Sequence, residues 1–213
     1  MSKFWDQHYK DFSENTPSPF AVWVTESQLS SQDEVVEIGC GNGRDGLYIS
    51  RFVSNYTGID LSPSAVQNAK QRLLLAQPKN SKTDFQQRDF STFEFSTESS
   101  RRLVVYSRFS LHSDDEEAED RLLSRLESIK RRELLVLIEV RTIFDELFGI
   151  GESVGNNAYV TDHYRRFIDP GVFRKKIEGM FKVSFFEMSD SFAPYKNERP
   201  KVLRIAFENF FKG

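Results

Sequence analysis

Apolar and polar residues repeat along this chain with two different periods, and the two periods alternate. Short apolar or β-branched runs predict strands, most clearly at residues 34–38 and 134–138. Between such runs, apolar residues three or four positions apart predict helices, as with Val66, Ala69 and Leu73. The run 134–138 is apolar throughout, which indicates a strand covered on both faces. Strands that alternate with helices predict an α/β domain with a mainly parallel sheet.

The predicted elements extend nearly from end to end of the chain. Strands are expected at residues 34–38, 56–60, 84–87, 103–106, 134–138, 182–188 and 202–207. Helices are expected at residues 4–9 and 20–29, from about residue 45, and from residues 63, 113 and 170. Only about a dozen residues separate the last two strands, and they include Pro194 and Pro200. Because this linker is too short for a helical crossover, we expect those two strands to pair antiparallel.

Two of these helices carry recognisable signals at their ends. Ser113 and Glu116 have the spacing of a capping box, and the basic residues 130–132 would end the same helix, where positive charge suits the helix dipole. Asp169, which precedes a proline, predicts the start of another helix, and Gly179 predicts its end.

The most specific motif is a glycine turn that follows the first predicted strand. Gly39, Gly41 and Gly43 lie between this strand and a predicted helix, where glycines let the backbone pass close to a ligand. The next strand ends in Asp60, and a carboxylate in that place can accept hydrogen bonds from a ribose. An adenosine-containing cofactor is therefore predicted. Arg44 stands where a dinucleotide-binding loop has its third glycine, so a nicotinamide dehydrogenase is disfavoured.

With these residues the chain resembles the class I S-adenosylmethionine (SAM)-dependent methyltransferases. The first motif of that family reads acidic-x-G-x-G-x-G and is matched from Glu37 to Gly43; the second is an acidic residue that closes the second strand, matched by Asp60. The resemblance covers about residue 34 to the C-terminus. It implies a Rossmann-like α/β fold: a seven-stranded, mostly parallel sheet with an antiparallel last strand and helices on both faces. It also implies S-adenosyl-L-methionine as cofactor and S-adenosyl-L-homocysteine as product.

The resemblance assigns the parts of the cofactor to residues at the strand ends. Asp60 would accept both ribose hydroxyls, Leu61 would pack on the adenine, and Asp89 with Phe90 would meet the adenine amino group and ring. The methionyl end would lie against Glu37, Gly39, Cys40, Gly41, Asn42 and Gly43. Tyr9 would cover the site from a helical cap within residues 1–30. The alternative for these carboxylates is a structural role, and for Tyr9 it is core packing.

Candidate acceptor residues follow the later strands. His112, His163 and Arg108 are the predicted catalytic residues, because histidine exchanges a proton near neutral pH and a guanidinium holds an anion. The predicted substrate-binding residues are Tyr106, Tyr164, Arg165, Arg166 and Arg199. Structural histidines and solvated surface arginines are the alternative interpretations.

Two segments, residues 106–112 and 163–168, are similar to a methyltransferase subgroup associated with bacterial surface-polysaccharide biosynthesis. This likeness implies a phosphorylated sugar, a polyol or a glycan end as the acceptor. A non-catalytic SAM-binding partner or regulatory module would share the cofactor motifs, and it stays open as the alternative function.

Composition limits the remaining classes. A length of 213 residues suits one α/β domain over residues 1–213, and a formal net charge of -3 argues against a nucleic-acid partner. Cys40 is the single cysteine, which excludes an intrachain disulfide and a cysteine metal cluster, and no metal is expected. The first residues lack the apolar region of a signal peptide, and no run of ~18 apolar residues occurs. We therefore expect a cytoplasmic monomer or homodimer without a membrane span.

Overall fold

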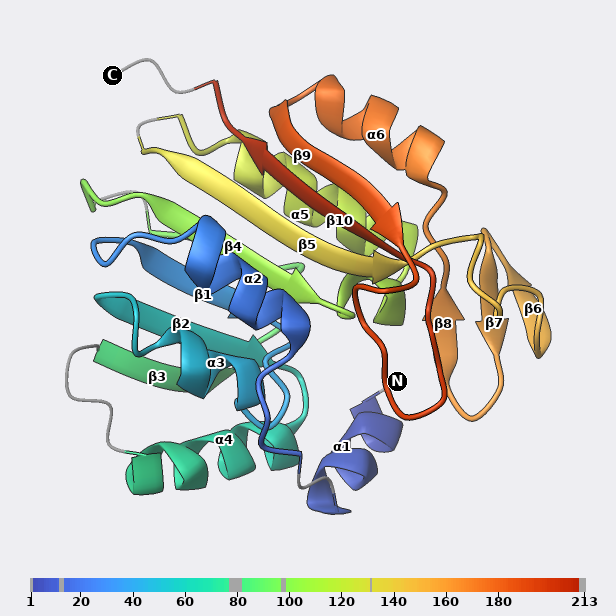
Figure 1. The fold of residues 1–213 in the computed structure, drawn as a ribbon, viewed down its shortest axis with the longest axis horizontal. Coiled ribbons are helices and arrows are strands. Elements are labelled where there is room, and N and C mark those ends of the chain that lie inside the picture. Colours follow the sequence, from blue (N-terminus) through green and yellow to red (C-terminus); the bar gives the residue numbers. More distant parts are fainter. Residues whose placement is uncertain (1, 12–13, 77–81, 97–98, 131, 211–213) are drawn as a thin grey trace.

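A seven-stranded mixed sheet organises the protein. The computed structural model describes residues 2–11, 14–76, 82–96, 99–130 and 132–210. Within them, seven strands pair in the order β3-β2-β1-β4-β5-β10-β9 (Figure 1). Their bounds are β1 Glu34–Ile38, β2 Asn55–Asp60, β3 Lys82–Gln87, β4 Leu103–Arg108, β5 Leu134–Arg141, β9 Lys182–Ser189 and β10 Val202–Glu208. Strand β10 is antiparallel to both β5 and β9, whereas β1 to β5 are parallel to one another. The predicted fold class is thereby confirmed.

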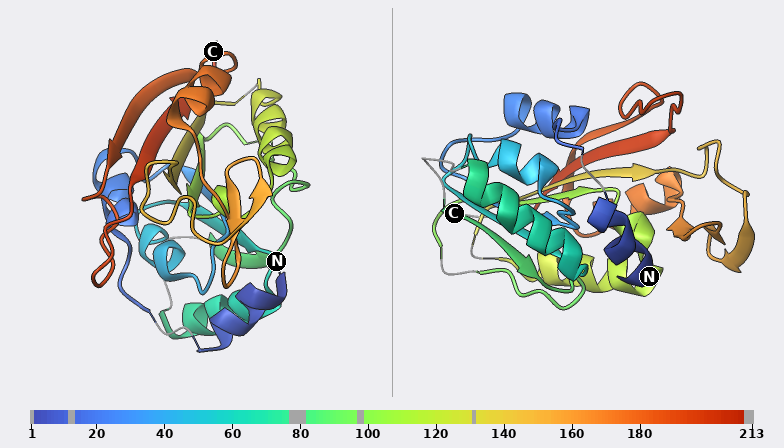
Figure 2. Two further views of the ribbon diagram at one scale, coloured as in Figure 1. Left: turned by 90° about the vertical axis from the view of Figure 1, so that its right-hand side faces the viewer. Right: turned by 90° about the horizontal axis from the view of Figure 1, so that it is seen from below.

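Helices cover both faces of this sheet, as the apolar strands require. One face packs against α2 (Pro19–Ser27), α3 (Arg44–Ile49) and α4 (Pro63–Ala76), and the other against α5 (Glu116–Glu127) and α6 (Pro170–Glu178). The three layers are visible in Figure 2, where α5 lies across the sheet from α2 and α3. Two separate apolar cores result, one on each face of the sheet.

The remaining elements lie beside the carboxyl ends of the parallel strands. They are α1 (Ser2–Asp11), the 3-10 turn η1 (Leu111–Ser113) and a small antiparallel sheet of β6 (Glu152–Gly155), β7 (Ala158–Val160) and β8 (Tyr164–Arg166). The sequence did not indicate this second sheet, because all four residues of β6 are exposed and show no alternation. Figure 1 shows it at the edge of the molecule, past the end of β5.

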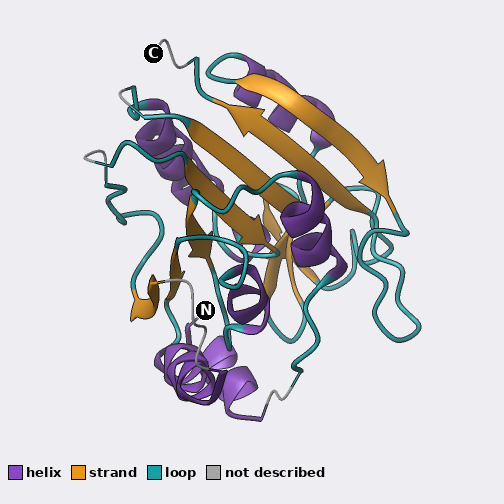
Figure 3. Ribbon diagram, turned by 60° about the vertical axis from the view of Figure 1, so that its left-hand side comes forward, coloured by secondary structure: helices purple, strands orange, loops and turns teal. Residues whose placement is uncertain are grey.

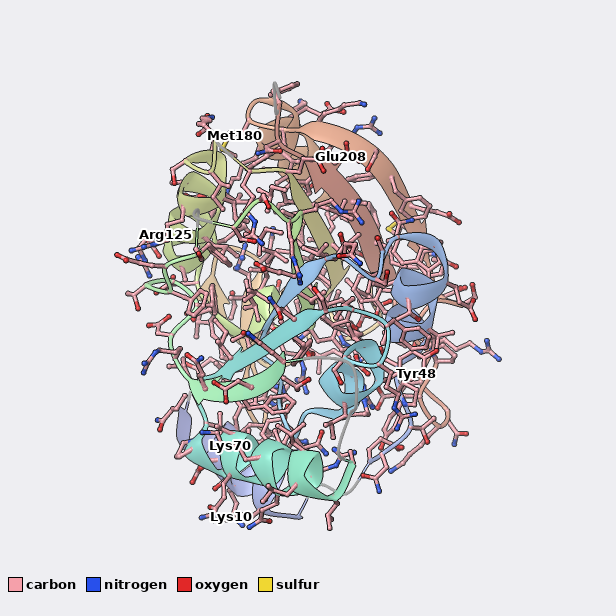
Figure 4. The ribbon with its side chains drawn as sticks, turned by 90° about the vertical axis from the view of Figure 1, so that its left-hand side faces the viewer. Lys10, Tyr48, Lys70, Arg125, Met180 and Glu208 are labelled. Carbon is pink, nitrogen blue, oxygen red and sulfur yellow. The ribbon has the colours of Figure 1, made fainter. Side chains whose placement is uncertain are left out.

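Helix α1 packs along α4 at one end of the molecule. The carboxylate of Asp6 accepts a hydrogen bond from the backbone N–H of Ser64, 3.0 Å away, and one from the Ser62 hydroxyl at 3.3 Å. Both donors belong to the start of α4, where unpaired N–H groups attract a negative charge. The helix pair is seen in Figure 3, and Figure 4 shows Lys10 of α1 and Lys70 of α4 at the same end of the molecule.

Of the two predicted helix N-caps, the one of α6 is confirmed and the one of α5 is wrong. Asp169 caps α6 as predicted, with Oδ1 accepting from the N–H groups of Gly171 and Val172 at 2.8 and 3.1 Å. The predicted capping box of α5 is wrong, because Ser113 belongs to the preceding 3-10 turn. Asp115 is the N-cap instead and accepts from the N–H of Ala118 at 2.8 Å.

Arg132 was expected at the end of α5, but that helix already ends at Glu127. The Arg132 side chain is buried beside the amino ends of β1 and β4. Its guanidinium donates to the carbonyl groups of Ser96 and Arg101 and forms an ion pair with Glu34. It therefore joins three segments that are distant in sequence.

Replacing this buried cation tests its structural role. We expect Arg132→Met to lower the free energy of unfolding by about 3 kcal/mol, because two carbonyl groups and the Glu34 carboxylate lose their charged donor. Urea unfolding measures the difference. Lys130→Met is the control, since Lys130 is exposed and its nearest carboxylate oxygen, on Glu127, is 3.9 Å away. Equal stabilities of the two variants would contradict the prediction.

Candidate functional site

A cavity of about 890 Å³ opens at the carboxyl ends of β1, β2 and β4. This is the edge where open parallel sheets bind ligands, and the volume suits a cofactor together with a small substrate. Its wall comes from α1, the glycine loop, the ends of β2 and β4, the segment after β3 and the loop between β9 and β10.

The glycine loop requires glycine for two reasons. Gly39 and Gly41 have φ values of 69° and 52°, in the left-handed region that other residues rarely adopt. In addition, a Cβ at Gly39 would lie 2.1 Å from the Ser110 hydroxyl oxygen, and one at Gly41 would lie 2.5 Å from the Tyr9 hydroxyl oxygen. The loop therefore fits closely between the end of β4 and helix α1.

Asp60 ends β2 and faces the cavity from beside this loop. Its Oδ2 accepts a hydrogen bond from the Gly41 N–H at 2.9 Å, and its Oδ1 accepts one from the Ser62 N–H at 2.8 Å. Burial raises the pKa of Asp60, and these two backbone donors oppose the shift. Each carboxylate oxygen keeps further acceptor capacity, so a pair of ligand hydroxyls can bind to Asp60 without disturbing the loop.

Glu37 is a second acidic group in the wall, and it is almost fully buried. The Tyr56 hydroxyl donates a hydrogen bond to its carboxylate. Burial raises the pKa of Glu37 well above its usual value, and the neighbouring carboxylate of Asp45 raises it further. Burial likewise raises the pKa of the Cys40 thiol, which argues against a thiolate nucleophile in the loop.

Asp45 is a further acidic group in the cavity wall; it is buried, and it was not predicted as a site residue. Its oxygens accept hydrogen bonds from the Ser18 N–H and hydroxyl, both at 2.7 Å, and from the Tyr106 hydroxyl at 2.8 Å. Arg44 approaches the same carboxylate with Nε at 3.4 Å and also lines the cavity. The available sequence signal is the Arg-Asp pair in the first turn of the helix after the glycine loop.

The structure divides the predicted site residues into two groups. Those that line the cavity are Tyr9, Glu37, Gly39, Cys40, Gly41, Asn42, Asp60, Leu61, Asp89, Phe90 and Arg108. Those that do not are Gly43, Tyr106, His112, His163, Tyr164, Arg165, Arg166 and Arg199. Most of the predicted cofactor residues are thus brought together, and most of the predicted acceptor residues are not.

Several residues of the second group have other partners. Tyr106 is fully buried, and its hydroxyl is bound to Asp45. Arg166 is also buried, with one guanidinium nitrogen 2.7 Å from a carboxylate oxygen of Glu119. His163 stacks on Phe4 of α1 with ring centroids 4.4 Å apart, and its Nδ1 lies 3.0 Å from an Asp162 carboxylate oxygen. These contacts explain why the three side chains do not reach the cavity.

His112 lies behind the cavity wall. It is buried, and its Nδ1 has no hydrogen-bond partner among the described residues. Burial lowers the pKa of His112 well below its usual value, and Arg141 lowers it further. The ring of Phe109, which does line the cavity, has its centroid 5.2 Å from that of the imidazole. The imidazole is consequently neutral at physiological pH.

Several other cavity residues were not predicted as site residues, and His8 and Arg141 are two of them. His8 of α1 lines the cavity together with Trp5 and Tyr9. Arg141, at the end of β5, lines it beside Arg108 and Phe109. The sequence contained a usable signal only for Arg141, because it ends the strand next to β4.

No helix within the described ranges has the length and apolar character needed to span a membrane. Among the same residues, no group of three or more His, Cys, Asp or Glu side chains could hold a metal ion.

Comparisons with known proteins find similarity to methyltransferases. Residues 35–131 match a family model described as a methyltransferase domain. No curated protein sequence matches the chain. Similar solved structures include a SAM-dependent methyltransferase from Methanosarcina mazei, with 16% identity, 89% of this chain and 98% of that chain covered, and a TM-score of 0.72.

Two other similar structures contain S-adenosylhomocysteine. One is magnesium protoporphyrin IX methyltransferase from Synechocystis PCC 6803, with 14% identity, 97% of this chain and 84% of that chain covered, and a TM-score of 0.62. The other is phosphoethanolamine N-methyltransferase 1 from Haemonchus contortus, crystallised with phosphoethanolamine, with 14% identity, 97% of this chain and 48% of that chain covered, and a TM-score of 0.72. Identities this low establish a common fold.

From the raised pKa of the buried Glu37 we predict how the free energy of unfolding changes with pH. Burial and Asp45 raise the pKa of its carboxyl group above 4.5, so the folded state holds the proton more tightly than the unfolded state does. The free energy of unfolding therefore falls as the pH rises through this range. Glu37→Gln lacks this loss, and we expect it to be more stable than the parent protein by about 1 kcal/mol or more at about pH 8.

Urea unfolding at several pH values measures this difference, which should shrink as the pH is lowered towards 4.5. Glu14→Gln is the control, because a hydrogen bond from the Thr16 N–H lowers the pKa of the exposed Glu14 carboxyl group. A constant difference between Glu37→Gln and the parent protein at all pH values would contradict the assignment.

Proposed function

We propose that this protein is a SAM-dependent methyltransferase that methylates a small anionic acceptor, such as a phosphorylated sugar, a polyol phosphate or a phosphorylated glycan end. The observation that carries the proposal is the glycine loop bonded to the Asp60 carboxylate at the mouth of a large cavity. The match of residues 35–131 to the methyltransferase domain supports the reaction class.

The cavity residues fit the cofactor part by part. Asp60 has two carboxylate oxygens that can accept from the two ribose hydroxyls, while its backbone donors keep it in place. Leu61 and Phe90 supply apolar surface for an adenine ring. Asp89 is bonded through Oδ1 to the Ser91 N–H at 2.8 Å, which leaves its other oxygen for an amino group.

The methionyl end fits the opposite part of the wall. The backbone of Gly39 and Gly41 lines this part of the cavity, and the buried carboxyl group of Glu37 suits the methionyl ammonium group. The Tyr9 hydroxyl lies against Gly41, so α1 can close over the bound cofactor and exclude water. In this proposal residues 1–30 are a cap within a single domain.

SAM supplies a methyl carbon already activated on a sulfonium sulfur. The carbon–sulfur bond breaks as the acceptor atom bonds to the carbon, and the sulfur leaves as a neutral thioether. The protein therefore has mainly to align the two molecules and to exclude water. A base is needed only where the acceptor atom carries a proton.

Arginine at the cavity wall supports an anionic acceptor. Arg108 lines the cavity, and guanidinium groups bind phosphate and carboxylate oxygens. A phosphorylated acceptor is also the substrate named for the similar structure from Haemonchus contortus. His112 and His163 remain candidates for proton transfer only if α1 or Phe109 moves, because neither lines the cavity.

The position of those histidines favours a second candidate function, a SAM-binding module that regulates a partner without catalysis. Both functions need the cofactor site, but only the methyltransferase turns over an acceptor.

The cofactor site is tested by Asp60→Ala. We expect this substitution to weaken S-adenosylhomocysteine binding at least tenfold, because charge-assisted hydrogen bonds contribute about 1.5 kcal/mol or more. Isothermal titration calorimetry measures the affinity. Asp84→Asn is the control, since Asp84 is exposed on β3 and does not line the cavity. Unchanged affinity in Asp60→Ala would contradict the ribose assignment.

The reaction is tested with a set of phosphorylated sugars, polyols and amines offered with SAM. Production of S-adenosylhomocysteine that depends on one acceptor would establish the methyltransferase, and Asp60→Ala should reduce it. Tight cofactor binding without turnover on any acceptor would favour the regulatory module. His112→Ala and His163→Ala should lower turnover more than cofactor affinity, and equal losses of both would indicate structural roles.

A further inference from the structure

We propose that Arg108 and Arg141 together bind the anionic group of the acceptor, and that Glu198 occupies this position until the acceptor displaces it. The inference rests on the proposed methyltransferase function and specifies its acceptor site. Arg141 was not predicted as a site residue, and Glu198 directly precedes the predicted substrate-binding residue Arg199.

A single aromatic ring holds the two arginines together at the cavity wall. The guanidinium carbons of Arg108 and Arg141 lie 4.3 and 5.7 Å from the ring centroid of Phe109, within the range of cation–π attraction. All three residues line the cavity. They come from adjacent strand ends, because β4 pairs with β5.

Phe109 adopts an unusual backbone conformation to reach this place. Its φ is 57°, in the left-handed region that is rare for an aromatic residue, and its N–H donates to the Glu139 carbonyl oxygen at 2.9 Å. Such conformations cost free energy and concentrate at functional sites. In this conformation the Phe109 ring contacts both guanidinium groups, and that contact offsets the free-energy cost of the unusual backbone.

Each arginine is held from behind by a buried carboxylate. Arg108 Nε lies 2.9 Å from a carboxylate oxygen of Glu139, and one guanidinium nitrogen of Arg141 bonds both oxygens of Asp145, at 2.9 and 3.0 Å. These contacts fix the planes of the two guanidinium groups. They use only part of each group, so further N–H donors remain for a ligand in the cavity.

The buried carboxylates behind the two arginines also serve a third guanidinium group. Glu139 also pairs with Arg204, whose Nε is 2.7 Å from its carboxylate. Three guanidinium groups, on Arg108, Arg141 and Arg204, therefore share the ion pairs of the two buried carboxylates. Of the three, Arg108 and Arg141 line the cavity, where they suit one anionic group of a ligand.

Glu198 pairs with Arg141 from the surface. Its carboxylate oxygen lies 3.3 Å from Arg141, and its side chain is 63% exposed, against 1% for that of Asp145. It belongs to a tight turn in which Tyr195 and Glu198 exchange backbone hydrogen bonds of 3.1 and 2.9 Å. The loop that carries this turn extends past the strand ends in Figure 1.

An ion pair with an exposed carboxylate is weak, because water and salt screen the attraction. A phosphate or carboxylate inside the cavity can contact Arg141 and Arg108 at once, so it binds these arginines better than Glu198 does. Glu198 then functions as a displaceable internal anion, and its removal should strengthen acceptor binding.

The experiment measures binding of inorganic phosphate and of acetate to the protein saturated with S-adenosylhomocysteine, at constant ionic strength. We expect Arg141→Gln and Arg108→Gln each to weaken binding of the preferred anion about tenfold, and Glu198→Gln to strengthen it about threefold. The opposite signs separate anion binding from general loss of structure. A preference for phosphate would indicate a phosphorylated acceptor, and a preference for acetate a carboxylate.

Two surface substitutions are the controls. Asp190→Asn removes a carboxylate from the same loop, where it pairs with Lys201 at 3.8 Å, and Arg174→Gln removes an exposed arginine on α6 that pairs with Glu178. Neither should change the anion affinity more than twofold. If an arginine variant does not fold, Glu198→Gln still tests the proposal, because replacing this exposed side chain should leave the fold intact.

The proposal is overturned if Glu198→Gln binds neither anion more tightly than the parent protein does, or if Arg141→Gln binds both normally. Failure of the proposed function has a different signature, which is no binding of S-adenosylhomocysteine by the parent protein. The anion titrations can then be made without it and still test the two-arginine site.

Discussion

The hydrogen bond from the Gly41 N–H to the Asp60 carboxylate is the contact on which the site depends. It ties the loop after β1 to the end of β2, and the same carboxylate also holds the Ser62 N–H at the start of α4. Asp6 then binds the neighbouring Ser64 N–H, which fastens α1 to α4. One short chain of backbone donors and two carboxylates thus sets the distance between loop and cap.

Charge is separated along the cavity. At the loop end, Glu37, Asp45 and Asp60 bring three carboxylates into the wall, each satisfied by hydroxyl or backbone donors. At the other end, Arg108 and Arg141 line the wall, and each pairs with a buried carboxylate behind it. Such an arrangement suits a cationic donor at one end and an anionic acceptor at the other, and a ligand bound in reverse would meet like charges.

Sequence patterns predicted a structural feature correctly where the interactions that cause it lie within a few residues of one another. The glycine spacing, the acidic strand end at Asp60 and the cap at Asp169 each act within a few residues, and they identified most of the loop side of the cavity. The acceptor side depends on contacts distant in sequence. His163 is held by Phe4, and Arg141 meets Arg108 only because β4 and β5 are neighbours. No pattern in one segment could indicate those pairings.

The two-arginine site also constrains the acceptor chemistry. A guanidinium that holds a phosphate or carboxylate oxygen stabilises its negative charge and so lowers its reactivity as a nucleophile. Arg108 and Arg141 therefore suit an anion that anchors the acceptor, while the methylated atom belongs to another group, such as a hydroxyl or an amine. That atom carries a proton, and its removal calls for a base. Among the histidines of the described residues, His8 alone lines the cavity, so in the proposed enzyme the base would be His8 unless a movement of α1 or Phe109 brings His163 or His112 to the acceptor.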